Sequence, residues 1–149
     1  MDPAMKTRSC SCLASVLAPL VWASVACSSA SPAATGTFPA DPYTTTTSDS
    51  GALVIDVRTS PQPPSRGTDE VQLTVTKASD GTPVDGLSLD VEPWMPAMQH
   101  GTSSPTVTAE GGGVYLVTEV YLYMPGVWDL RTAISGAATD NATPQLTIQ

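Results

Sequence analysis

Apolar residues alternate with polar ones along most of the chain after about residue 52. A strand with one buried face has this period of two, because successive side chains point to opposite sides of a sheet. The alternating positions are Leu53, Ile55 and Val57; Val71, Leu73 and Val75; Leu87, Leu89 and Val91; Leu116, Val120 and Leu122; Leu130 and Ile134; and Leu146 and Ile148. The pattern predicts six or seven short strands and no helix.

Turn-forming segments rich in proline and glycine separate the predicted strands. They are Pro61 to Gly67, Asp80-Gly81-Thr82-Pro83, Gly111-Gly112-Gly113 and Met124-Pro125-Gly126. The last segment suits a type II turn, which does not match the twist of a tight hairpin, so we expect a wider loop there. About seven short strands in roughly 100 residues indicate an all-β, immunoglobulin-like two-sheet sandwich, with an open barrel as the structural alternative.

The start of the chain has a different pattern, typical of an export signal. Lys6 and Arg8 precede an uncharged run that extends from Leu13 to Ala26. We therefore predict a lipoprotein-type signal peptide over residues 1–26. Ser24-Val25-Ala26-Cys27 resembles a lipobox, in which the cysteine, here Cys27, receives the lipid.

Two other interpretations of the leader stay open. One is ordinary cleavage after Ala26, because Ser24 stands where a lipobox usually has an aliphatic residue. The other is an uncleaved anchor, against which weigh Pro19 and a span near the lower limit of about 17 residues for a membrane helix. The lipoprotein hypothesis places the protein in a bacterial cell envelope, on the periplasmic face. Ser28 after Cys27 favours the outer membrane if the cell has two.

Residues 27–50 consist largely of Ser, Ala, Thr and Pro and include Thr44-Thr45-Thr46-Thr47. So little apolar surface predicts a flexible tether, because burial would not offset the entropy of ordering it. The folded domain is then expected from residue 51 to residue 149.

The net charge of the chain without its leader excludes some classes of binding partner. Without Asp2, Lys6 and Arg8 of the leader, the chain keeps 13 acidic and 4 basic side chains. This balance argues against nucleic acid and against an anionic membrane surface as partners, so we expect membrane contact through the lipid anchor only.

The candidate chemistry lies in two segments that hold every methionine outside the leader. Met95 and Met98 precede His100, the single histidine of the chain, and Met124 follows the fourth predicted strand. Thioether sulfurs with one imidazole favour Cu(I), so these four residues are the predicted metal ligands. The alternative is that each methionine fills a gap in the core.

Two tryptophans flank the predicted ligands. Trp94 is a candidate to cover the bound ion through its ring face, although an aromatic residue between a strand and a loop is more often part of the core. Trp128 is a second candidate beside the metal, but it shares a strand face with Leu130 and Ile134, which favours the core more strongly.

Four segments carry a family resemblance. They are Asp80-Gly81-Thr82-Pro83-Val84, Met95-Pro96-Ala97-Met98-Gln99-His100-Gly101, Gly113-Val114-Tyr115 and Met124-Pro125-Gly126-Val127-Trp128-Asp129-Leu130. With these segments, the stretch from Gly81 to Ile134 resembles the YtkA-like and FixH-like family of small exported β-sandwich domains.

The resemblance implies an Ig-like fold, attachment to the cell envelope, and a role in copper handling or oxidase assembly. It places the family's Met-x-x-Met-x-His segment on Met95, Met98 and His100, and its Met-x-Gly-x-Trp segment on Met124, Gly126 and Trp128. Family members often have Gly or Asn before the histidine, where this chain has Gln99.

Missing residues weigh against an enzyme. A blue-copper centre needs two His and a Cys, and one histidine with no cysteine in the domain cannot supply them. Catalytic zinc typically takes three protein ligands, and no serine lies in a recognisable nucleophile turn. Two hypotheses stay open. One is a Cu(I)-binding protein for copper carriage or buffering, with a copper-accepting envelope protein or an oxidase as partner. The other is a metal-free envelope interaction or structural module.

Overall fold

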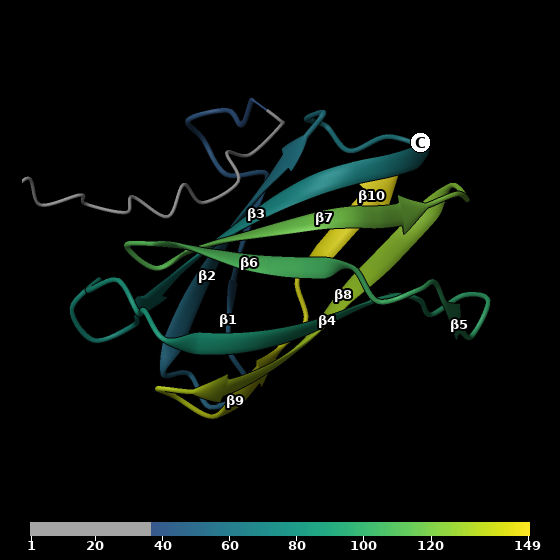
Figure 1. The fold of residues 1–149 in the computed structure, drawn as a ribbon. Coiled ribbons are helices and arrows are strands. Elements are labelled where there is room, and N and C mark those ends of the chain that lie inside the picture. Colours follow the sequence, from purple (N-terminus) through teal and green to yellow (C-terminus); the bar gives the residue numbers. More distant parts are fainter. Residues whose placement is uncertain (1–36) are drawn as a thin grey trace, which may run out of the picture. The chain divides into compact units, whose positions relative to one another are not determined.

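The computed structural model describes residues 37–149, which form two antiparallel β-sheets and, within that range, no helix (Figure 1). The predicted signal peptide and Cys27 lie outside the described residues. The strands are β1 (Thr44–Thr47), β2 (Leu53–Ser60), β3 (Gly67–Lys77), β4 (Leu87–Met95), β5 (His100–Gly101), β6 (Thr106–Gly111), β7 (Val114–Leu122), β8 (Gly126–Gly136), β9 (Asp140–Ala142) and β10 (Gln145–Ile148).

The two sheets form an all-β, immunoglobulin-like sandwich, which confirms the predicted fold class. One sheet has the strand order β1-β2-β3-β7-β6, and the other has β10-β8-β4-β5 with β9 also paired to β8. The structure has more strands than predicted because β1, β5, β6 and β9 were not recognised. None of these strands carries two large apolar side chains in alternation, so none shows a hydrophobic period in the sequence.

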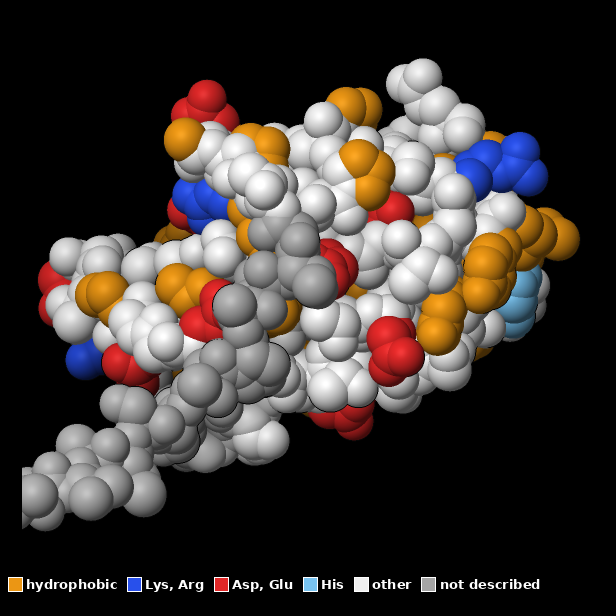
Figure 2. Space-filling model, turned by 45° about the horizontal axis from the view of Figure 1, so that its top comes forward, with side chains coloured by type: hydrophobic (Ala, Val, Ile, Leu, Met, Phe, Trp, Pro, Cys, Tyr) orange, Lys and Arg blue, Asp and Glu red, His pale blue; other side chains and the backbone are white. Residues whose placement is uncertain are grey.

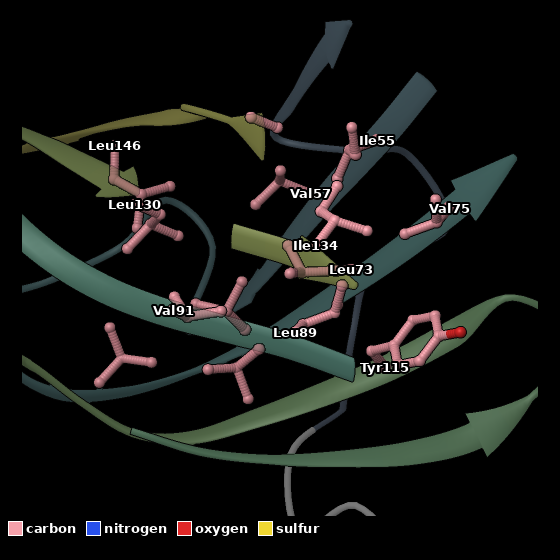
Figure 3. Packing of buried hydrophobic residues seen from close by; sticks show 14 of the residues in the cluster. Ile55, Val57, Leu73, Val75, Leu89, Val91, Tyr115, Leu130, Ile134 and Leu146 are labelled. Atoms are coloured by element: carbon pink, nitrogen blue, oxygen red, sulfur yellow. The ribbon is translucent and has the colours of Figure 1, made fainter. Parts of the chain in front are cut away.

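The core lies between the sheets and is built from the alternating positions of both. Ile55, Val75 and Tyr115 come from one sheet, and Leu89 and Leu130 from the other (Figure 3). In β2 every second residue is buried, as the period of two predicts. Tyr115 also uses its hydroxyl group, which donates to the Val84 carbonyl oxygen and accepts from the Leu87 N–H.

The predicted face of β7 is wrong at one position. The sequence grouped Leu116 with Val120 and Leu122, and all three are buried. The β7 side chains of the core cluster, however, are Tyr115, Val117, Val120 and Leu122, without Leu116. The register between β3 and β7 shifts at this point, and Glu119 has a φ of 65°. A bulge inserts one extra residue into the strand and so reverses the alternation. Odd-numbered residues of β7 face the core before the bulge, and even-numbered residues face it afterwards.

The predicted tether also needs a correction, because Thr44–Thr47 forms β1 and pairs with β2. An edge strand can be held by backbone hydrogen bonds, and the β-branched threonine suits a strand without supplying much apolar surface. The ordered chain begins still earlier, since the Arg58 guanidinium donates to the Ala40 carbonyl oxygen. The domain boundary at residue 51 was therefore placed too late.

Tyr123, Met124 and Pro125 connect β7 in one sheet to β8 in the other. A connection that changes sheets is not a tight hairpin, which agrees with the wider loop expected from Pro125 and Gly126. The part of the chain that the structure describes has no helix long and apolar enough to cross a membrane.

Candidate functional site

The first predicted segment forms a hairpin rather than a loop. Met95 is the last residue of β4, and it lies opposite His100 of β5 in the strand register. The sequence placed Met95 on a loop after Val91, but β4 continues through Pro93. Proline is tolerated there because the Pro93 carbonyl group points away from β8 and accepts from the Thr102 N–H. The missing N–H of Pro93 lies on that same side, so no hydrogen bond to β8 is lost.

The turn of this hairpin runs from Pro96 to Gln99 and carries Met98. The Met98 N–H donates to the Met95 carbonyl oxygen at 3.2 Å, and the Gln99 N–H donates to the Pro96 carbonyl oxygen at 3.3 Å. Gln99 has a φ of 53°, in the left-handed region. Gly and Asn adopt that region most readily, which gives a physical reason for the family preference at this position.

Trp128 links the hairpin to the β7–β8 connection. Its indole N–H donates to the Met124 carbonyl oxygen at 2.9 Å, and its ring lies edge-on to the His100 ring at a centroid distance of 6.4 Å. Trp128 is fully buried, as its strand position predicted. His100 and Met124 therefore lie at the same end of the sandwich.

Met95 approaches the same connection from the core side. A Cβ atom built on Gly126 would lie 2.7 Å from the Met95 Cε atom, so the glycine leaves the space that this methyl group fills. Cross-strand partners have Cβ atoms about 5 Å apart and share a face of the sheet, so Met95 and His100 are neighbours. The structure thus gathers Met95, His100 and Met124 around Trp128.

The four predicted ligands differ in exposure. Met95 belongs to the core and is 5% exposed, whereas Met98 is 60% exposed on the turn. Met124 is partly buried against the core, and His100 is exposed. The core-filling interpretation therefore holds for the position of Met95, while the Met98 side chain is turned to solvent.

Trp94 lies neither in the core nor on the face of β4 that carries Met95. It is half-buried, and it occupies the alternate position to Met95 along the strand. The Arg131 guanidinium lies 4.1 Å from the centre of the Trp94 ring, and Arg131 also pairs with Glu92 at 3.8 Å. Trp94 is therefore an aromatic partner of Arg131 on the outer face of the sheet.

Sequence reasoning missed the part played by two glycines. A Cβ atom on Gly101 would lie 2.8 Å from the Pro93 carbonyl oxygen and 3.3 Å from the Trp94 ring, and Gly126 makes room for Met95. A glycine inside a strand often marks such a close approach, so His100-Gly101 and Pro125-Gly126 carried a usable signal. The pairing of Arg131 with Trp94 had none, because it depends on strand register.

Large hydrophobic side chains are also exposed on the segments that form this end. Within the described range, the large ones are Met98, Tyr123 and Val127, which we call the apolar patch. Tyr123 stacks on Tyr121 at 5.6 Å, and the Tyr121 carbonyl oxygen accepts from the Thr102 hydroxyl just after β5. Figure 2 shows hydrophobic side chains beside the pale-blue histidine at the edge of the molecule.

No group of three His, Cys, Asp or Glu side chains that could hold a metal ion occurs among residues 37–149. The two segments at the hairpin end carry side chains of another kind, namely thioethers and one imidazole. Soft donors of this kind suit Cu(I), or Ag(I) as its analogue.

The class of domain that the structure defines is an all-β, immunoglobulin-like sandwich. The model of the YtkA-like family matches residues 47–133, which covers most of the strands and all four predicted ligands. The chain belongs to the YtkA-like family; its resemblance to FixH-like proteins stays a prediction. No curated protein and no solved structure matches it.

Proposed function

We propose that this domain binds one Cu(I) ion where the β4–β5 hairpin meets the β7–β8 connection. Met95, Met98, His100 and Met124 are the proposed ligands. The observation that carries the proposal is the link from His100 through Trp128 to Met124, with Met95 opposite His100. His100 and Met124, which are 24 positions apart, thus belong to segments that meet at one end of the sandwich, and their side chains are an imidazole and a thioether.

The proposed ligands differ in exposure, so they would contact the ion at different stages of binding. Met98 and His100 face solvent and would meet the ion first, while Met95 and Met124 are anchored by the core. The hydrogen bond between the Met98 N–H and the Met95 carbonyl oxygen holds the two residues near each other. This lowers the entropy cost of bringing both side chains to one metal ion. The ion would be bound at the surface, from which it can be handed on.

The cellular role that fits this site is carriage or buffering of copper in the bacterial envelope, without turnover chemistry. The leader-like residues 1–26 and the lipobox-like cysteine support export and attachment through Cys27. A copper-accepting envelope protein or an oxidase is the proposed partner, and the membrane is contacted through the lipid alone.

A competition titration with a chromophoric Cu(I) chelator tests the proposal. We would use the full chain carrying Cys10→Ser, Cys12→Ser and Cys27→Ser, because thiolates are also soft ligands. The parent should hold one ion, and Met98→Leu and His100→Gln should each lower the affinity by at least about tenfold. Val127→Ala is the matched control, since it is exposed at the same end but offers no donor. A parent chain that cannot compete with the chelator contradicts the proposal.

The apolar patch favours a second candidate, a metal-free interaction module. Three large exposed hydrophobic side chains at one end are typical of a contact surface for another protein. Met98→Leu separates the two candidates, because it removes the sulfur atom and conserves the hydrophobic volume. The interaction module would tolerate this change, whereas the Cu(I) site would not.

A further inference from the structure

The three methionines of the hairpin end differ most in their access to solvent. Met98 is 60% exposed, Met95 is 5% exposed beneath Gly126, and Met124 is partly buried. The backbone hydrogen bonds of the Pro96–Gln99 turn hold Met98 at the tip of the hairpin. A water-soluble reagent therefore reaches one thioether of this cluster ahead of the other two.

The geometry points to Met98 as an oxidation site that switches the metal-binding end of the domain. A peroxide is the oxidant: a lone pair of the Met98 sulfur attacks one peroxide oxygen, an S–O bond forms and the O–O bond breaks. The thioether loses two electrons and becomes a sulfoxide, and hydrogen peroxide is reduced to water. Sulfoxide reductases reverse this change, so the modification can act as a switch.

Position on the turn makes this modification compatible with the fold. The sulfoxide oxygen of an exposed Met98 is hydrated, whereas the same atom on Met95 would place a polar group in the core beside Gly126. Oxidation of Met98 should therefore leave the thermal unfolding midpoint nearly unchanged. The apolar patch would at the same time lose its most exposed hydrophobic side chain.

The consequence for metal binding rests on the proposed function. A sulfoxide no longer offers the soft thioether sulfur that Cu(I) prefers. Since changes outside the ligand set already cost tenfold or more in metal affinity, loss of the Met98 ligand should lower Cu(I) affinity by at least about tenfold. Oxidation of Met98 in the metal-free domain would thus prevent Cu(I) from binding with full affinity, without unfolding the domain.

The first experiment measures the order of oxidation on the metal-free full chain with Cys10→Ser, Cys12→Ser and Cys27→Ser. The chain is treated with hydrogen peroxide, and fragment-ion mass spectrometry assigns the added oxygen to each methionine. Met98 should be oxidised on the order of tenfold faster than Met95, because the rate follows exposure. Equal rates, or faster oxidation of Met95 or Met124, would overturn the inference and leave the proposed function untouched.

The second experiment repeats the treatment with Ag(I) bound, in chloride-free buffer, because Ag(I) mimics Cu(I) but is not oxidised by peroxide. Protection of Met98 supports its role as a ligand. Ag(I) binding without protection overturns the switch alone, whereas failure to bind either Ag(I) or Cu(I) defeats the proposed function and the switch together. Met98→Leu is the control, and its remaining Cu(I) affinity should not respond to peroxide.

Discussion

Gly126 and Met95 show how a residue without a side chain determines the place of another. Gly126 has a φ of 128°, and a Cβ atom there would lie 2.7 Å from the Met95 Cε atom. A side chain at this position would strain the backbone, because its φ is one that L-residues rarely adopt. It would also displace the methyl group of Met95. Gly67 allows the backbone strain to be measured without the side-chain contact. Its φ is 133°, and no atom lies within 4 Å of a Cβ atom added to it.

We expect Gly126→Ala to lower the free energy of unfolding by about 1 kcal/mol more than Gly67→Ala, because Met95 must repack only in the first variant. Urea unfolding of both variants measures the difference. Adding Met95→Ala to each variant should remove the excess. Equal losses for the two alanine variants would show that the contact with Met95 costs nothing.

Asp69 is a carboxyl group inside the sandwich. Its side chain is 1% exposed, and its oxygens accept hydrogen bonds from the N–H and hydroxyl groups of Ser65. Burial raises the pKa of Asp69 above its ordinary value of 3.8, and the Ser65 hydrogen bonds offset only part of this effect. The folded state therefore binds this proton more tightly than the unfolded state does.

The sign of the pH dependence follows from that difference. Stability from the protonated Asp69 is fully present below pH 3.8 and is lost as the pH rises through the higher folded-state pKa. Asp69→Asn should be more stable than the parent chain at pH 7, with a smaller difference at pH 3. Urea unfolding at both values measures it, with exposed Asp90→Asn as the control. A variant less stable than the parent at pH 7 would mean that the hydrogen bonds to Ser65 outweigh the burial of charge.

At the scale of elements, strands with several alternating apolar side chains were predictable and the other strands were not. The period of two identified β2, β3, β4 and β8 because each presents several apolar side chains to the core. β5 consists of two residues and is a strand only because it pairs with the end of β4. No local sequence pattern therefore predicts it. The bulge at Glu119 is likewise a feature of pairing between β3 and β7.

The candidate site, too, was predictable in some respects and not in others. Residue types and spacing were sufficient to select Met95, Met98, His100 and Met124, because soft donors are recognisable in a sequence. Their exposure was not predictable, since it depends on β4 ending at Met95 and on the turn that follows. The space for Met95 depends on Gly126, and strand register decides that contact.

Asp140 at the start of β9 holds the two sheets together near the β1–β2 turn. Its carboxylate accepts from the Ser50 N–H and hydroxyl groups, and the Asp49 N–H donates to the Asn141 carbonyl oxygen. Hydrogen bonds from the Ser48 and Ser50 side chains lower the pKa of Asp140 to about 2. The ionised form is thus the one that the folded state favours.

We expect Asp140→Asn to lower the melting temperature at pH 7 and to have a much smaller effect near pH 2. The stability from a lowered pKa is present above 3.8 and is lost as the pH falls through about 2. Thermal unfolding across this range, with Asp90→Asn as the exposed control, measures the effect. A loss that persists unchanged at pH 2 would indicate that the charge of Asp140 is not involved.

At the scale of the whole molecule, the described domain depends on residues before its first predicted strand. β1 covers the edge of β2, and Tyr43 packs against the core. The Tyr43 N–H donates to the Val57 carbonyl oxygen, and its hydroxyl oxygen accepts from the Thr147 N–H of β10. Tyr43 thus joins β2 of one sheet to β10, an edge strand of the other.

A chain that begins at residue 51 should therefore be less stable than one that begins at residue 37. Loss of the partly buried Tyr43 and of the pairing with β1 should lower the free energy of unfolding by about 2 kcal/mol or more. It also exposes β2 as an open edge, which favours association between copies. Urea unfolding and sedimentation at two concentrations compare the two chains, and Tyr43→Ala in the longer one measures the share of the side chain. Equal stability and a monomeric state in both would show that the fold needs nothing before residue 51.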